Sequence, residues 1–216
     1  MKRRQKPGAV KRRIGIFAGA FDPVHVGHVA FALQALEQAG LDEVVFLPER
    51  RPRLQADRPE AEHYAHRVAM IRRALRPYRR LRVIETTGKN FTVARTLPML
   101  QSVFTGDTLV MLVGSDVALT MPDWQHAGRL LAATETVIGV RSEHSIADIE
   151  AHAQAWQPAP HGLIVLPSYA SDVTSSRVRE ALRRGTHADG ILDSVRRYAR
   201  REWLYVWPEF ARQRAS

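Results

Sequence analysis

A short apolar strand that runs into a glycine-bearing turn and then into two histidines constrains this chain more than any other feature. Residues 15–28 read Gly-Ile-Phe-Ala-Gly-Ala-Phe-Asp-Pro-Val-His-Val-Gly-His. Small residues let backbone N–H groups approach an anion, and a helix that begins at the histidines adds free N–H donors and the positive end of its dipole. His25 and His28 are three residues apart, so both imidazoles lie on one side of the first helical turn. The segment predicts a phosphate-binding turn and, with it, a nucleotide ligand.

Apolar strands and amphipathic helices alternate along the rest of the chain. Pro98 predicts a break or kink in one helix, and Gly185 predicts the end of another. Such alternation indicates an α/β fold with a doubly wound, mostly parallel sheet, helices on both faces and ligands at the carboxyl ends of the strands. The predicted strands cover residues 13–17, 43–47, 81–85, 108–113, 135–140 and 163–166, and the predicted helices cover residues 26–39, 63–75, 92–101, 124–132, 146–156, 175–184 and 191–200.

Length and charge indicate one domain with a basic arm. The chain of 216 residues is long enough for one substantial core, which we expect over residues 13–216, preceded by a basic arm over residues 1–12. The net charge is +10, and residues 1–13 carry seven basic side chains and no acidic one. No aromatic residue interrupts this run, so we expect a solvated arm rather than one that binds nucleic acid.

Two absences narrow the class of protein. No stretch approaches the roughly 18 apolar residues of a membrane span, so no membrane partner is expected. The chain has no cysteine, which excludes disulfides, thiolate catalysis and cysteine–zinc sites and is typical of a cytoplasmic enzyme. These features leave the oligomeric state open.

The two histidines have three interpretations. Each alone is typical of a surface histidine, and the His-x-x-His spacing is compatible with zinc, but no third ligand follows at a comparable spacing. As a pair after a strand and a tight turn they favour phosphate, because imidazole donates to phosphate oxygens. No metal site is therefore predicted. Asp22, in the turn, is assigned equally to capping the following helix and to catalysis.

Polar residues also follow the strand predicted over residues 108–113. Asp116 comes two residues after Gly114, where its carboxylate is placed to accept hydrogen bonds from ribose hydroxyls, as acidic residues do in dinucleotide folds. The plainer alternative is a loop aspartate that begins a helix. The apolar strand in front of it favours the ribose interpretation.

A second anion-binding candidate begins at residue 174, in Thr-Ser-Ser-Arg-Val-Arg. Hydroxyls at a helix start are typical N-caps, and the same helix start attracts an anion. Together with the first motif, Ser175, Ser176 and Arg179 predict a second phosphate clamp, whereas Arg177 is expected to be exposed. Trp124 is assigned either to packing or to stacking on a flat heterocycle.

Taken together, these motifs resemble a known family. The pattern G-x-F-x-G-x-F-D-P-x-H-x-G-H, followed by Val-Gly-Ser-Asp at residues 113–116 and by the distal Ser175, Ser176 and Arg179, is similar to the nucleotidyltransferases that carry an H-x-G-H motif. Within them the chain most resembles the nicotinate- or nicotinamide-mononucleotide adenylyltransferases, over residues 13–206. The resemblance implies a Rossmann-like domain with a core strand order of 3-2-1-4-5.

The activity that the resemblance implies is adenylyl transfer. ATP, with Mg²⁺, and a pyridine mononucleotide, in the first place nicotinate mononucleotide, would give a dinucleotide and pyrophosphate. The catalytic residues would be His25, His28 and Arg179, which would stabilise the phosphates during in-line attack. Thr92 and Trp124 would form the acceptor side. The residues implied to bind ATP and its phosphates are Gly19, Ala20, Phe21, Gly27, Arg53, Gly114, Asp116, Ser175 and Ser176.

Departures from the family pattern gather on the acceptor side. The usual Gly-Gly-Thr is Ala18-Gly19-Ala20, which keeps the backbone of the turn. The usual Pro-Pro-His-Lys loop is replaced by Arg51-Pro52-Arg53, and the usual Ser-Tyr-Thr by Asn90-Phe91-Thr92. Two alternatives therefore stand beside the first interpretation: a related nucleotidyltransferase with another phosphorylated acceptor, and a nucleotide-binding protein without activity.

Overall fold

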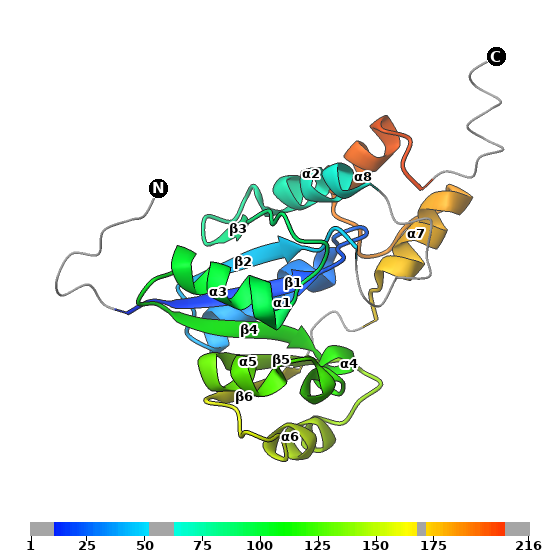
Figure 1. Cartoon of the computed structure of the whole chain (residues 1–216). Coiled ribbons are helices and arrows are strands. Elements are labelled where there is room, and N and C mark those ends of the chain that lie inside the picture. Colours follow the sequence, from blue (N-terminus) through cyan, green and yellow to red (C-terminus); the bar gives the residue numbers. More distant parts are fainter. Residues whose placement is uncertain (1–10, 52–62, 168–171, 206–216) are drawn as a thin grey trace.

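Figure 1 shows the chain as a computed structural model, which describes residues 11–51, 63–167 and 172–205. Arg53, predicted to contact phosphate, lies outside these residues. The strands are β1 (Arg13–Gly19), β2 (Glu43–Pro48), β3 (Leu81–Val83), β4 (Thr108–Gly114), β5 (Glu135–Val140) and β6 (Leu163–Pro167). The helices are α1 (Val26–Gln38), α2 (Tyr64–Leu75), α3 (Val93–Val103), α4 (Ser115–Ala118), the 3-10 helix η2 (Met121–Asp123), α5 (Ala127–Ala133), α6 (Ile146–Gln154), α7 (Ser175–Arg184) and α8 (Asp193–Arg201).

The described strands form one parallel sheet in the order β3-β2-β1-β4-β5-β6. This confirms the predicted doubly wound sheet and its 3-2-1-4-5 core, to which β6 adds an edge strand. The order reverses between β1 and β4, because the chain first builds outward to β3 and then crosses back. Connections after β1 and β4 therefore leave in opposite directions, and such a point forms a crevice at the carboxyl ends of the strands.

Successive strand residues enter two separate cores, one on each face of the sheet. Phe17 and Phe46 belong to the core shared with α1, α2 and α8. Ile16 and Val45, their chain neighbours, belong to the core shared with α3, α5 and α6. The alternation follows from the pleat, which points successive side chains to opposite faces. Figure 1 shows helices on both sides of the sheet, as predicted, with α7 beyond the ends to which the strand arrows point.

Of the break or kink predicted at Pro98, the break is wrong. Helix α3 runs from Val93 to Val103 with Pro98 inside it. Proline lacks the N–H that would bond to the carbonyl of Ala94, four residues earlier. Ala94 is exposed, so water can bond to that carbonyl and the helix continues.

The helix predicted over residues 124–132 begins later than expected, at Ala127. Residues before it form the short 3-10 helix η2, and Trp124 follows in an extended conformation. His126 then adopts a left-handed backbone with φ of 66°, which α-helical geometry does not allow. Trp124 therefore lies in a connection between β4 and α5 rather than on a helix.

Arg12, the last residue of the predicted arm, is bound to the domain. Arg12 donates a hydrogen bond to the carboxylate of Asp107 at 2.6 Å.

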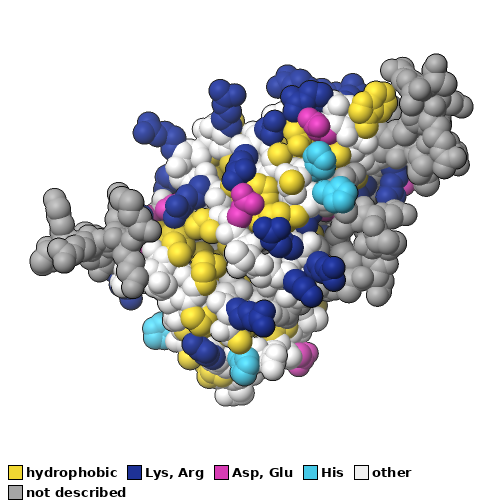
Figure 2. Space-filling view, turned by 45° about the horizontal axis from the view of Figure 1, so that its top comes forward, with side chains coloured by type: hydrophobic (Ala, Val, Ile, Leu, Met, Phe, Trp, Pro, Cys, Tyr) yellow, Lys and Arg dark blue, Asp and Glu magenta, His cyan; other side chains and the backbone are white. Residues whose placement is uncertain are grey.

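Figure 2 shows Lys and Arg side chains scattered over one face of the molecule rather than gathered in a single stripe. Of the helices that the structure describes, none is both long and apolar enough to cross a bilayer.

Candidate active site

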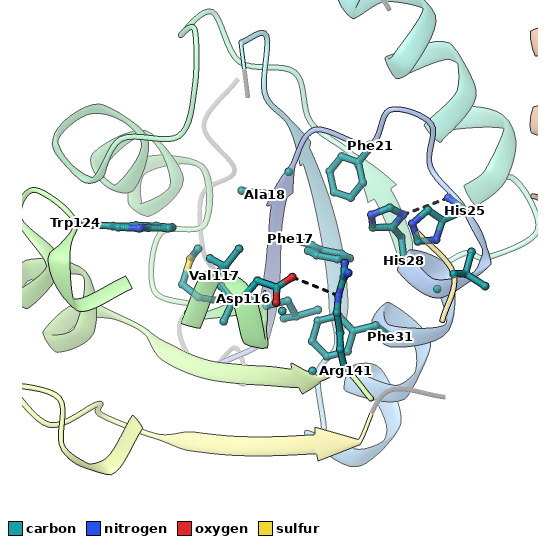
Figure 3. Close-up of a pocket in the computed structure, with 18 residues that line it drawn as sticks. Phe17, Ala18, Phe21, His25, His28, Phe31, Asp116, Val117, Trp124 and Arg141 are labelled. Atoms are coloured by element: carbon teal, nitrogen blue, oxygen red, sulfur yellow. Dashed lines mark hydrogen bonds and ion pairs between the residues drawn. The ribbon is translucent and has the colours of Figure 1, made fainter. Parts of the chain in front are cut away.

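A pocket lies at the reversal point of the sheet, where the carboxyl ends of β1, β4 and β5 meet the start of α1 (Figure 3). Such crevices bind ligands in open α/β sheets. Arg141, at the end of β5, points into it beside Asp116. The predicted site residues that line this pocket are Gly19, Phe21, Gly27, His25, His28, Gly114, Asp116 and Trp124.

The two histidines lie ring against ring at the start of α1, with their planes tilted by 38°. Their ring centroids are 3.8 Å apart. The backbone N–H of His25 donates to Nδ1 of His28 at 3.2 Å. Because Nδ1 accepts this hydrogen bond, the proton of a neutral His28 ring sits on Nε2, which is left as a donor. Nδ1 of His25 is buried and has no hydrogen-bond partner among the described residues.

Both imidazoles are neutral at neutral pH. Burial lowers the pKa of His25 to about 3, with a further lowering from the charge of Arg141. Burial also lowers the pKa of His28 well below its usual value, and the charges of His25 and Arg141 act in the same direction. The pair therefore offers N–H donors to a phosphate rather than two positive charges.

The turn between β1 and α1 is held from behind by groups distant in the sequence. A guanidinium N–H of Arg67 donates to the carbonyl of Ala20, and Nη1 of Arg179 donates to the carbonyl of Asp22 at 2.5 Å. The hydroxyl of Ser175 donates to the carbonyl of Pro23 at 3.0 Å. Since a trans peptide points its N–H opposite to its C=O, the N–H of Phe21 faces away from Arg67.

These contacts bring the distal cluster beside the first motif. Arg179 is only 5% exposed, and its Nη2 also donates to the hydroxyl of Ser176 at 3.1 Å. Thr174 caps α7, as expected, because its hydroxyl accepts from the backbone N–H of Arg177. Arg177 itself is exposed, as predicted. Ser175 and Arg179 support the turn rather than line the pocket, so their contact with phosphate stays a prediction. The same holds for Ala20, whose carbonyl is bonded to Arg67.

A second polar group lies at the ends of β4 and β5. Asp116 lies in the first turn of α4 and is 46% exposed at its side chain, and its Oδ2 is 3.7 Å from Nε of Arg141. His144 shares a hydrogen bond with the hydroxyl of Ser115 at 2.8 Å, and its Nδ1 is 3.8 Å from Oδ1 of Asp116. Donor atoms of Asp116, Glu143 and His144 lie within 4.8 Å of one another, which is close enough to share a cation. The guanidinium of Arg141 opposes that use.

The predicted acceptor side is partly brought to the pocket. Trp124 lines it, and its ring lies 6.0 Å from that of Phe91. Thr92 occupies the N-cap position of α3 without a side-chain cap hydrogen bond and is not among the lining residues. Its hydroxyl is buried and has no hydrogen-bond partner in the described part of the chain.

Comparisons with known proteins agree with this arrangement. A family profile described as "Cytidylyltransferase-like" matches residues 16–181. A protein of Gemmatimonas aurantiaca named "Probable nicotinate-nucleotide adenylyltransferase" is 31% identical over 89% of this chain and 92% of its own. The nicotinate-nucleotide adenylyltransferase of Bacillus subtilis is 29% identical over 90% of this chain and 98% of its own. The chain belongs to the cytidylyltransferase-like family. It is a nucleotidyltransferase, as the sequence resemblance predicted.

Solved structures show the same fold. The nicotinic acid mononucleotide adenylyltransferase of Plasmodium falciparum, solved in a complex with NaAD, matches with a TM-score of 0.72 over 90% of this chain and 97% of its own. Its sequence identity is 16%, so this likeness concerns the fold. A Rossmann-like domain, expected from the resemblance, is thereby confirmed.

Sequence reasoning missed several residues around the site of this nucleotidyltransferase. Arg141 lines the pocket and follows β5 directly. Its position after a predicted strand was the sequence signal that could have marked it as a site residue. Gly139 lets the ring of Phe31 form one wall, because a Cβ at Gly139 would lie 2.7 Å from that ring. No local signal marked the contact between Asp22 and Tyr205, which joins residues 183 positions apart.

Proposed function

We propose that this protein transfers an adenylyl group from MgATP to nicotinate mononucleotide, giving a dinucleotide and pyrophosphate. The observation that carries the proposal is the neutral pair His25 and His28 at the start of α1, in the pocket at the reversal point of the sheet. Nε2 of His28 is left as a donor because Nδ1 is already bonded. The names of the curated relatives support nicotinate mononucleotide as the acceptor.

The reaction needs positioning and charge stabilisation more than proton transfer. A phosphate oxygen of the mononucleotide forms a bond to the α-phosphorus of ATP while the bond from that phosphorus to the β-phosphate oxygen breaks, and pyrophosphate leaves with the electron pair. The attacking phosphate is already ionised at neutral pH, so no general base is required. Donors fixed before the reaction are the main source of rate in such a step.

Each end of the pocket has its own proposed role. His25 and His28 donate to the phosphate oxygens on which charge develops, together with the N–H groups of the turn and the start of α1. Arg179 adds positive charge from behind the turn. Asp116 accepts from the ribose hydroxyls of ATP, and Arg141 exchanges its contact with Asp116 for one with phosphate.

Mg²⁺ enters as part of the MgATP substrate. This ion prefers oxygen ligands and commonly keeps several waters while it is bound through substrate phosphates. The imidazoles and the Arg141 guanidinium in the pocket are suited to phosphate oxygens rather than to Mg²⁺. Asp116, a half-exposed carboxylate in the same pocket, would be available to accept from a water of that ion with an oxygen that the ribose does not use.

Trp124 and Phe91 support a flat acceptor. We assign stacking on the pyridine ring to Trp124. Its side chain lines the pocket, and its ring centroid is 6.0 Å from that of Phe91. The buried hydroxyl of Thr92, without a partner in the described residues, supports a polar contact on the same side.

Turnover is tested by incubating the protein with MgATP and nicotinate mononucleotide and measuring pyrophosphate and dinucleotide in equal amounts. Nicotinamide mononucleotide under the same conditions compares the two acceptors through kcat/KM. We expect turnover with both products and a higher kcat/KM for the nicotinate form. Tight binding of MgATP without turnover on either mononucleotide would contradict the proposal.

A further inference from the structure

Tyr205, just after α8, lies against the phosphate-binding turn. Its hydroxyl donates to Oδ1 of Asp22 at 2.7 Å. Tyr205 is 5% exposed and Asp22 is 2% exposed, so this hydrogen bond is shielded from water. The bond joins the C-terminal part of the described chain to the residue three positions before His25.

Asp22 connects Tyr205 to the predicted phosphate clamp. Its carbonyl accepts from Nη1 of Arg179 at 2.5 Å, and its Oδ2 lies 3.9 Å from the same nitrogen. The carboxylate thus stands close to the guanidinium without a short ion pair. Its Oδ1 accepts from the hydroxyl of Tyr205, and the charge of Arg67 also acts on this carboxylate.

The backbone on both sides of this hydrogen bond is in an uncommon conformation. Phe21, next to Asp22, has φ of 49°, and Tyr205 has φ of 62°. Bulky side chains rarely occupy the left-handed region, and such residues persist where the surroundings hold them and often mark functional sites. Leu204, packed in the core beside Tyr205, anchors the C-terminal side.

We propose that Tyr205 is a positioning residue for adenylyl transfer, which acts through Asp22 to fix both the turn before His25 and the direction of the Arg179 guanidinium. This inference rests on the proposed function. Without the hydroxyl, Oδ1 of Asp22 loses this donor, and its carboxylate turns toward Arg179 and draws the guanidinium into a closer ion pair. A guanidinium neutralised in that way contributes less to binding phosphate.

A matched control lies on the preceding helix. The hydroxyl of Tyr198 shares a hydrogen bond of 2.9 Å with Nδ1 of His66, which ties α8 to α2. Tyr198 is also buried, at 8% exposure, and neither residue of this pair lines the pocket. Tyr198→Phe and Tyr205→Phe therefore remove the same chemical group from two buried tyrosines, one in a partly buried and one in a buried hydrogen bond.

The experiment measures kcat and KM for MgATP and for nicotinate mononucleotide, and the Kd of MgATP alone, in both variants, below their melting temperatures. We expect Tyr205→Phe to lower kcat/KM for MgATP by about tenfold or more, because small misplacements of catalytic groups are costly. KM for the mononucleotide stays within about twofold, as do all constants of Tyr198→Phe. Equal constants for the two variants would overturn the proposal.

Two further measurements keep the outcome clear. If the wild-type protein shows no turnover, the proposed function fails, but an MgATP Kd about tenfold weaker in Tyr205→Phe than in Tyr198→Phe still supports the positioning role. If the MgATP Kd is then the same in both variants, the positioning role of Tyr205 is refuted. If Tyr205→Phe does not fold, Asp22→Ala removes the same hydrogen bond from its other end and frees the turn before His25, but it leaves no carboxylate to draw in Arg179. We then expect a lower kcat with the MgATP Kd within about twofold of the wild-type value, and an unchanged kcat would count against the proposal.

Discussion

The polar residues in and behind the β1 end of the pocket are buried, whereas Asp116 and Arg141, at the β4 and β5 end, are partly open to solvent. Asp22, His25 and Arg179 are each 5% exposed or less. The side chains of Asp116 and Arg141 are 46% and 34% exposed, and their charged groups are 3.7 Å apart.

The difference follows from the cost of burying polar groups. A buried polar group without a partner is expensive, and contacts from Arg67, Ser175 and Tyr205 hold the turn at the β1 end before a ligand arrives, while Nδ1 of His25 has no partner among the described residues. An exposed ion pair is worth little, so Asp116 and Arg141 can change partners at low cost. One end of the pocket therefore positions the phosphates, while the other exchanges protein contacts for substrate contacts.

The largest effect on kcat/KM is expected from a substitution at the β1 end of the pocket. His28→Ala removes a preorganised donor to the phosphates and should lower kcat/KM by about 10²–10³. Circular dichroism should show an unchanged fold. His187→Ala, at a histidine whose side chain is 78% exposed and does not line the pocket, is the control and should leave kcat/KM as it is. Near-normal turnover of His28→Ala would place the chemistry elsewhere.

Burial of His25 predicts a dependence of stability on pH. Its pKa is lowered from 6.5 to about 3 in the folded protein, so between these values the unfolded chain binds a proton that the folded chain does not. Stability is therefore lost as the pH falls from 6.5 toward 3, by about tenfold in the unfolding equilibrium constant per pH unit.

Denaturant unfolding of the wild type and of His25→Gln, from pH 7 to pH 4, isolates this contribution. The stability difference between the two proteins should move against the wild type as the pH falls. A difference that does not change with pH would show that His25 titrates normally and that the β1 end is wetter than the structure indicates.

At the β4 and β5 end of the pocket, a substitution should lower activity but not stability. Arg141→Met removes a charge-assisted contact to phosphate and should lower kcat/KM for MgATP by about tenfold or more. The melting temperature should hardly move, because the ion pair with Asp116 is exposed. A large fall in melting temperature would mean that both ends of the pocket are structural.

The smallest effect is expected on the acceptor side. Trp124→Leu keeps apolar volume but removes a stacking surface and should raise KM for the mononucleotide by about three- to tenfold. KM for MgATP should stay the same, since Trp124 lies away from the histidine pair (Figure 3). Equal changes in both KM values would assign Trp124 to the shape of the pocket instead.

The sequence by itself determined the order of strands and helices, the turn with its two histidines, and the helix start at Ser175. These are local signals, because periodicity, glycine and capping hydroxyls act within a few residues. It misjudged Pro98 and the helix start after Trp124, where solvent exposure and a left-handed residue decided the outcome.

Only the tertiary structure decided which polar groups meet. Arg67, Arg179 and Tyr205 reach the turn of residues 20–23 from positions 47 to 183 residues away. Arg141 reaches Asp116 because β4 and β5 are neighbours in the sheet. Hydrogen bonds and burial depend on distance in space, and so the neutral state of His25 and His28 is a property of the folded chain rather than of the motif that contains them.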